Sequence, residues 1–190
     1  DESKQSPLTN ETEVLTSTME NIDMKALFSL TYGMYVVSTG GEKLNGQVAN
    51  TVMQITAEPL CVATCLNKAN LTTELCIKHG NFSVAVLEQD VPMTFIGRFG
   101  FKSGRVIDKF DGVKYTLGPT GAPLLEEWSI AAFDAKIVKT VETETHVLFI
   151  GEVMKAVHYK DATPLTYADY HLIKKGKSPK TAPTFGFNAL

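Results

Sequence analysis

The chain has 190 residues, of which 44% are hydrophobic and 21% are charged, and its formal net charge is -3. This length suits one domain that buries roughly 70% of its unfolded surface, so the fold needs no disulfides. Without a basic block, an apolar run of about 20 residues or a signal segment, we expect a soluble, cytoplasmic protein that binds neither nucleic acid nor membrane.

The order of apolar runs and turn signals predicts how the chain is organised. Residues 1–23 are polar and lack a sustained period, so we expect a flexible arm or an expression remnant there. One domain should then occupy residues 24–190, with a C-terminal tail at 165–190. Glycine, proline and asparagine separate the short apolar runs that follow. The patterns predict strands at 34–38, 47–56, 60–66, 81–87, 130–141 and 146–158, and helices near 24–30, 70–79, 91–98 and 167–174.

The last two predicted strands form the clearest hairpin. Phe133, Ala135 and Ile137 alternate with their neighbours before the polar link at 142–145, so these strands should be long, curved and central. Sequential antiparallel strands with few helices between them favour a β-barrel over a doubly wound sheet.

The segment 45–54 carries an unusual number of polar residues for a core strand. Asn45-Gly46 is a turn signal, and glutamine, asparagine and threonine occur on both faces of the strand that follows. Residues 67–73 lead into a predicted helix with Asn70 as its N-cap. Free amides, the Thr72 and Thr73 hydroxyls and the Lys68 ammonium could bind a monophosphate there. The alternative is an ordinary capped helix start.

A glycine-rich stretch at 97–105 is the third candidate. It places Arg98, Lys102 and Arg105 among three glycines and beside two phenylalanines, which could bind an anion or an aromatic ring. The alternative is a solvated loop anchored by its phenylalanines. Cysteines are too few and too irregularly spaced for a metal centre, so we expect reduced thiols and no metal site.

The assembled motifs resemble the flavin reductase-like family of the FMN-binding split-barrel fold. The resemblance covers about residues 28–187. Within the family, the chain is similar to flavin reductase domains of anaerobes and of some cyanobacteria, where such a domain may be fused to rubredoxin or to a diiron flavoprotein. It rests on blocks at 32–37, 45–46, 50–54, 58–60, 67–68, 95–100, 103–105, 108–110 and 145–153.

This resemblance implies a mainly β, six-stranded antiparallel split β-barrel with a few peripheral helices. It also implies a homodimer with FMN at each interface, reduced by NADH or NADPH. Electrons would pass to rubredoxin, a diiron flavoprotein, ferric iron or free flavin. A non-catalytic FMN carrier, reduced only by a protein partner, is the alternative function. A barrel for pyridoxal phosphate or haem is a third possibility.

The resemblance also implies which residues hold the cofactor. The isoalloxazine would lie along residues 49–54, with the phosphate near the start of the predicted helix. His146 is the candidate catalytic side chain, because histidine titrates near neutral pH; the alternative is a hydrogen bond across the dimer interface. The predicted cofactor-binding residues are Asn45, Ala49, Asn50, Thr51, Val52, Met53, Gln54, Leu66, Asn67, Lys68, Asn70, Thr72, Ser103 and Arg105.

Overall fold

The computed structural model describes residues 21–182 and Thr184. Most of the predicted N-terminal arm and the end of the predicted tail lie outside this range. The chain divides into two compact units, residues 1–31 and 32–190. In the described part of the first unit, the predicted helix is the 3-10 helix η1 (Met24–Ser29), whose N-cap Asp23 accepts a hydrogen bond from the Lys25 amide.

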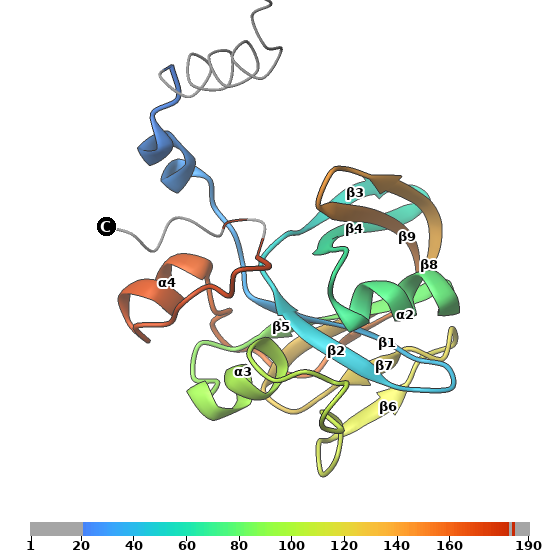
Figure 1. The fold of residues 1–190 in the computed structure, drawn as a ribbon. Coiled ribbons are helices and arrows are strands. Elements are labelled where there is room, and N and C mark those ends of the chain that lie inside the picture. Colours follow the sequence, from blue (N-terminus) through green and yellow to red (C-terminus); the bar gives the residue numbers. More distant parts are fainter. Residues whose placement is uncertain (1–20, 183, 185–190) are drawn as a thin grey trace, which may run out of the picture. The chain divides into compact units, whose positions relative to one another are not determined.

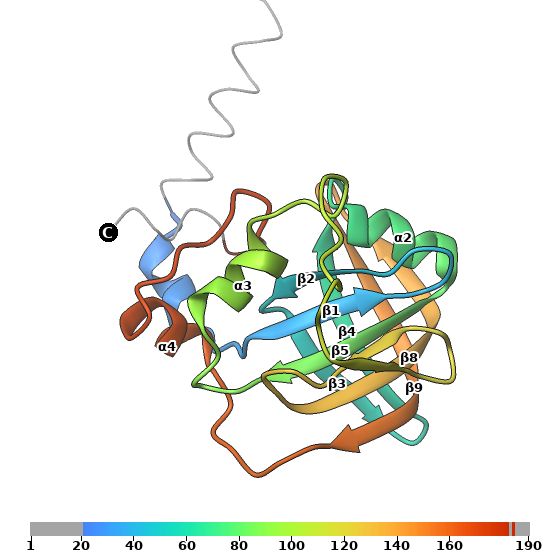
Figure 2. The same ribbon diagram turned by 90° about the horizontal axis from the view of Figure 1, so that it is seen from below.

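A seven-stranded antiparallel sheet forms the frame of the second unit (Figures 1 and 2). Its order is β2-β1-β5-β8-β9-β4-β3. Five of the six predicted strands are present, within a few residues at their ends; the sixth, at 47–56, is divided. The strands are β1 (Tyr35–Thr39), β2 (Asn45–Ala49), β3 (Val52–Ala57), β4 (Leu60–Asn67), β5 (Asn81–Leu87), β8 (Ser129–Glu142) and β9 (His146–His158).

The smaller elements are helices α2 (Leu71–His79), α3 (Met93–Gly100) and α4 (Tyr167–Leu172), and strands β6 (Tyr115–Leu117) and β7 (Pro123–Leu125). The three helices match the predicted ones. Strands β6 and β7 pair only with each other, and the sequence did not predict them, because three residues are too few to show a period.

The predicted strand at 47–56 is in fact two strands. It breaks at Asn50 and Thr51, where the Thr51 hydroxyl donates to Asn50 Oδ1 at 3.0 Å and the Thr51 carbonyl accepts from the Cys65 amide at 3.2 Å. Before the break β2 pairs with β1, and after it β3 pairs with β4. One continuous segment therefore supplies both ends of the sheet order and closes it into a split barrel. The sheet has seven strands rather than the expected six because of this break.

The hairpin β8–β9 lies at the centre of the sheet, as predicted. Its strands have 14 and 13 residues, and its register shifts after Asp134 and after Ile137. Such irregularities bend and twist a long hairpin, which the barrel requires. Inside the barrel Phe82, Phe149 and Leu66 are fully buried, and a second cluster packs beneath α3 around Phe99 and Phe110.

Gly151 in β9 offers a test of this packing. A Cβ at Gly151 would lie 2.7 Å from the Phe82 ring and 2.8 Å from Ala135 Cβ. We expect Gly151→Ala to lower the free energy of unfolding by about 1–3 kcal/mol through overpacking. Gly97→Ala is the matched control, because a Cβ at Gly97 in α3 meets nothing within 4 Å and alanine favours a helix by about 0.5–1 kcal/mol. Chemical denaturation measures both; equal effects would contradict the packing described.

Candidate functional site

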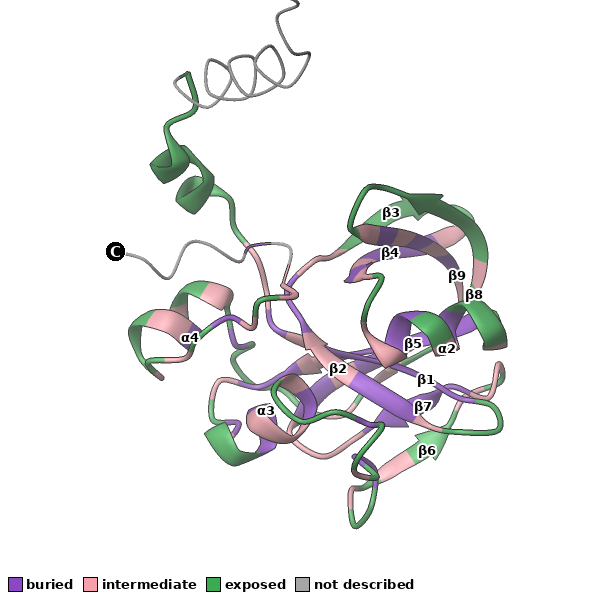
Figure 3. Ribbon diagram, viewed as in Figure 1, coloured by how far each residue is buried: buried purple, intermediate pink, exposed green. Residues whose placement is uncertain are grey.

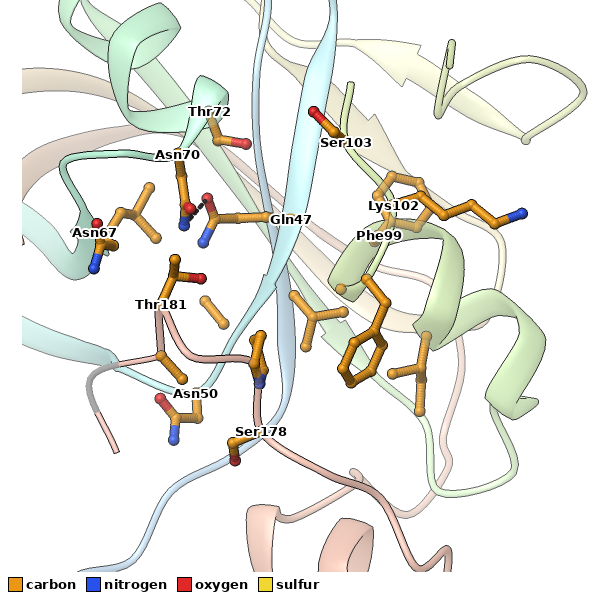
Figure 4. Close-up of a pocket in the computed structure, with 18 of the residues that line it drawn as sticks. Gln47, Asn50, Asn67, Asn70, Thr72, Phe99, Lys102, Ser103, Ser178 and Thr181 are labelled. Carbon is orange, nitrogen blue, oxygen red and sulfur yellow. Dashed lines mark hydrogen bonds between the residues drawn. The ribbon is translucent and has the colours of Figure 1, made fainter. Parts of the chain in front are cut away.

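A cavity of about 320 Å³ lies where the barrel splits. It is bounded by β2, the end of β4, the start of α2, helix α3, the loop at 101–105 and the tail at 177–182. Figure 4 shows labelled side chains from these elements around it. All of them belong to the second unit.

Amide side chains form one wall of the cavity. Asn70 Nδ2 at the start of α2 donates to Gln47 Oε1 of β2 at 3.1 Å, as the dashed line in Figure 4 marks. Beside this pair, Asn45 Nδ2 donates to Thr72 Oγ1 at 2.8 Å. Two side-chain bonds thus tie β2 to α2 across the cavity.

Asn70 occupies the N-cap position that the sequence predicts, but its side chain makes no capping hydrogen bond. The amide group is used in the bond to Gln47 instead. The Asn70 side chain therefore leaves the first turn of α2 uncapped, and of its amides that of Thr73 is bonded to the Asn70 carbonyl at 3.1 Å. The turn carries the positive end of the helix dipole. Its N–H groups are suited to a negatively charged ligand.

The turn before α2 is held by Asn67. Its Oδ1 accepts a bond from the Ala69 amide at 2.9 Å, and its carbonyl accepts one from Thr73 Oγ1 at 2.6 Å. Thr73, a candidate phosphate contact from the sequence, therefore serves the turn. Asn67 is also one of the residues that line the cavity.

The loop at 101–105 approaches β2 very closely. A Cβ at Gly104 would lie 1.9 Å from Asn45 Oδ1, so a larger residue there would displace the Asn45 side chain from its bond to Thr72. Lys43 Nζ donates to the Gly104 carbonyl at 2.7 Å, and Arg105 forms an ion pair with Glu74 of α2. Lys102 extends away from the amide wall in Figure 4. The loop therefore places Arg105, rather than Lys102, beside α2.

The opposite wall is apolar. Met34, Ile96 and Phe99 line it, and each is almost fully buried. Phe99 contacts Phe95 and Phe110 with ring centroids 5.2 and 5.4 Å away. A flat ligand with one polar edge would find complementary groups on both sides of the cavity.

One buried cation adjoins these walls. Lys109 lines the cavity and is only 5% exposed. Its ammonium donates to the carbonyls of Gly46 at 2.8 Å and Phe99 at 2.9 Å. Burial lowers the pKa of Lys109 to about 8.

The tail after α4 covers one side of the cavity. Tyr170 donates its hydroxyl to the Lys177 carbonyl at 2.8 Å, and His171 Nδ1 donates to the Gly176 carbonyl at 2.9 Å. Further along, Thr184 Oγ1 accepts from Asn50 Nδ2 at 3.0 Å. Contacts from both α4 and the strand break therefore hold the tail in place.

The structure brings together part of the predicted site. The predicted residues that line the cavity are Asn45, Ala49, Asn50, Leu66, Asn67, Asn70, Thr72, Ser103 and Arg105.

The remaining predicted residues lie outside the cavity lining. Thr51 is at the strand break, and Val52, Met53 and Gln54 belong to β3. Lys68 Nζ pairs with Glu142 Oε2 at 3.2 Å. His146 pairs in register with Asn67 on the neighbouring strand, and its Nδ1 lies 2.8 Å from Thr145 Oγ1.

Sequence reasoning missed several cavity residues. The alternation that predicts one strand at 47–56 gives Gln47 no role, because the strand in fact breaks after Ala49. Lys109 belongs to the block at 108–110 that supports the family resemblance. That block is the one feature of the sequence that could have indicated Lys109. The sequence predicts a C-terminal tail at 165–190, but its place beside the cavity depends on contacts with α4.

The family follows from comparison with known proteins. Residues 27–174 match the model of the flavin reductase like domain, and the chain belongs to this family. No helix within residues 21–182 is long and apolar enough to cross a bilayer.

Two curated relatives are similar over most of the chain. The ferric-chelate reductase (NAD(P)H) of Archaeoglobus fulgidus is 48% identical over 86% of this chain and 98% of its own. The high molecular weight rubredoxin of Moorella thermoacetica is 47% identical over 86% of this chain and 72% of its own. Among solved structures, the NADH:FAD oxidoreductase of Streptomyces globisporus C-1027 superposes with a TM-score of 0.65 at 27% identity, over 72% of this chain and 81% of that one.

Proposed function

We propose that the cavity binds FMN and that the protein takes a hydride from NADH or NADPH and passes the electrons to an external acceptor. The observation that carries this proposal is the arrangement of the cavity itself. An amide wall on β2 and α2 faces a buried apolar wall that includes Phe99. This pattern suits a flat ring with a hydrogen-bonding edge.

In this proposal the ring lies along β2 and the phosphate at the start of α2. Strand β2 pairs with β1 on one edge only, so the other edge presents backbone groups to a ligand. Such donors at the pyrimidine side of a flavin would stabilise negative charge there. Thr72, Ser103 and the first turn of α2 are placed for the phosphate.

We propose FMN rather than FAD because the N–H groups at the start of α2 are suited to a terminal phosphate monoester. The cavity of about 320 Å³ lies within the range of ligand sites. To identify the ligand, the protein is incubated with FMN and FAD together. The bound flavin is then released and separated to show which of the two it is.

The names of the relatives guide the choice of acceptor. One is called a ferric-chelate reductase and another a high molecular weight rubredoxin. We include a ferric chelate and a redox protein such as rubredoxin or a diiron flavoprotein as candidate acceptors, with free flavin as a third. Bound flavin supplies the capacity to accept a hydride and to release electrons singly.

The protein itself supplies position and shielding. The apolar wall and the tail exclude water from one face of the ring, which leaves the other face for nicotinamide. We retain His146 as the proposed proton-handling side chain, because its register partner Asn67 lines the cavity.

Reduction of the bound flavin tests the proposed activity. Under anaerobic conditions, NADH or NADPH should bleach the visible flavin band within a turnover time. His146→Asn should bind FMN normally and bleach at about the wild-type rate, because hydride transfer gives the anionic reduced flavin without a proton; if His146 accepts the proton released on reoxidation, turnover with an acceptor should slow by about 10²-fold or more. Absence of bleaching with both nucleotides, together with reduction by a protein donor, would instead establish the non-catalytic electron carrier.

Paired substitutions test the placement of the ring. Gln47→Ala removes a cavity side chain and a hydrogen bond worth about 0.5–1.5 kcal/mol, so FMN affinity should fall about 2- to 10-fold. Lys68→Ala is the control, because Lys68 pairs with Glu142 outside the cavity lining. Fluorescence titration measures both affinities. A larger loss of FMN affinity for Lys68→Ala than for Gln47→Ala would show that the phosphate does not bind at the site proposed here.

Exposed apolar side chains support a homodimer. Met53 and Ile55 on β3 are 53% and 42% exposed, and Figure 3 shows β3 and the adjoining ends of β8 and β9 at the surface. Val138, Val141 and Met154 on those two strands are also exposed. Apolar groups on a sheet surface mark an interface when they gather in this way. We therefore propose that β3, β8 and β9 contact a second copy.

Charge substitutions on β3 test this interface. The double variant Met53→Lys, Ile55→Lys should be monomeric in light scattering, because it buries two unpaired charges if the dimer forms. Ile77→Lys is the control: Ile77 is similarly exposed, at 59%, but lies on α2. A dimeric double variant, or a monomeric wild type, would exclude the proposed interface.

A further inference from the structure

Lys109 has no role in the function proposed so far. It is almost fully buried, and in the described part of the chain no carboxylate comes within ion-pair distance of it. Its sequence neighbour Asp108 accepts a bond from the Phe110 amide through Oδ1 at 2.9 Å. A buried lysine without a carboxylate is costly to keep charged, so its retention beside a cavity calls for an explanation.

Part of the explanation is structural. The Gly46 carbonyl belongs to the edge strand β2, and the Phe99 carbonyl belongs to the last turn of α3. Both carbonyls lack an obligatory partner in their own element. By binding both, the ammonium joins β2 to α3 and fixes two walls of the cavity relative to each other.

The two carbonyls do not balance the charge. Even with them, and with the negative end of the α3 dipole nearby, the pKa of Lys109 falls from 10.5 to about 8. Because Lys109 lines the cavity and is nearly buried, an anion bound in the cavity would offset its charge. Gly46, to which Lys109 is bonded, directly follows Asn45, whose side chain reaches Thr72 at the start of α2.

We infer that Lys109 is the positioning residue for the anionic end of the ligand, and that protonation of its ammonium is coupled to binding of a phosphate monoester in this cavity. This inference rests on the proposed function for its ligand, FMN. In the empty protein Lys109 holds β2 and α3 together through two carbonyls. When the phosphate dianion is bound, the same ammonium supplies the buried positive charge that offsets it.

The surrounding charged groups do not provide this balance. Of the nearby carboxylates, Glu42 pairs with Lys78 and Glu74 with Arg105, whereas Asp108 accepts a bond from the Phe110 amide. Within the described residues, Asp111 has no ion pair with Lys109 or with any other cation. Arg105 pairs with Glu74, Lys43 binds the Gly104 carbonyl, and Arg98 donates to the Asp111 carbonyl. The charged and titratable groups on the neighbouring loops, helices and tail are Glu42, Lys43, Glu74, Arg98, Lys102, Arg105, Asp108, Asp111, Tyr167, Tyr170 and Lys177.

The sign of the coupling follows from linkage. Below pH 8 the ammonium of the empty protein is already charged, so binding takes up no proton from solution. Above pH 8 the empty protein has neutral Lys109, while the phosphate raises its pKa, so binding must take up a proton. FMN affinity should therefore change least near pH 7, between the second pKa of the phosphate at about 6 and that of Lys109 at about 8, and fall by up to about tenfold per pH unit above pH 8.

Binding measurements across pH test the inference with the full chain. FMN and riboflavin are titrated between pH 6.5 and 9.5, and calorimetry in buffers of different ionisation enthalpy counts the protons taken up. We expect uptake on FMN binding to rise from near zero at pH 7 toward one at pH 9. Riboflavin, which lacks the phosphate, should show neither the uptake nor the fall in affinity.

Three variants separate charge from structure. Lys109→Met should bind FMN at least about tenfold more weakly at pH 7 and lose the pH dependence. Lys109→Arg should keep the charge and also lose the pH dependence, because arginine stays protonated. Lys78→Met, on the surface of α2, should behave as wild type. If Lys109→Met fails to fold, proton uptake by the wild type still decides.

The possible outcomes are distinct. If neither flavin binds at any pH, the proposed function fails. If FMN binds with no proton uptake near pH 8–9, the function stands and the role of Lys109 is excluded. If riboflavin shows the same uptake as FMN, the charge acts on the ring and the assignment to the phosphate is overturned.

Discussion

The rest of the structure depends on the backbone hydrogen bonding of one segment, residues 45–57. Its first half pairs with β1 and its second half with β4. No single straight strand can satisfy both neighbours, so the chain breaks at Asn50 and Thr51. The break lets the sheet close and leaves one edge of β2 unpaired. The cavity lies at this opening, so the geometry that completes the barrel also creates the site.

Side chains then replace the backbone bonds that the opening removes. Gln47 and Asn45 of β2 bond to Asn70 and Thr72 of α2, and Lys109 binds the free Gly46 carbonyl. Buried polar groups of this kind need partners, because an unpaired group costs about 1–3 kcal/mol. The opening is therefore kept rigid by polar contacts, and a ligand can use those groups without reorganising the strand.

Much of the fold could be predicted from the sequence, because long strands carry a clear alternation and glycine or proline marks their ends. The hairpin β8–β9 and helix α2 illustrate this. The site was harder. Asn70 was correctly placed at the N-cap, but its bond to Gln47 depends on how β2 lies beside α2. The roles of Lys109 and of the tail likewise arise only from contacts between distant segments, which no local pattern encodes.

The break at Asn50 and Thr51 also has a consequence for pairing errors. A slip of one residue in a strand exchanges its two faces, and a single edge strand can slip alone. Here β2 and β3 are joined by only two residues, so a slip against β1 would pull the segment out of its alignment with β4. The register of each pair therefore constrains the register of the other. Both registers together fix the position of this segment beside the cavity.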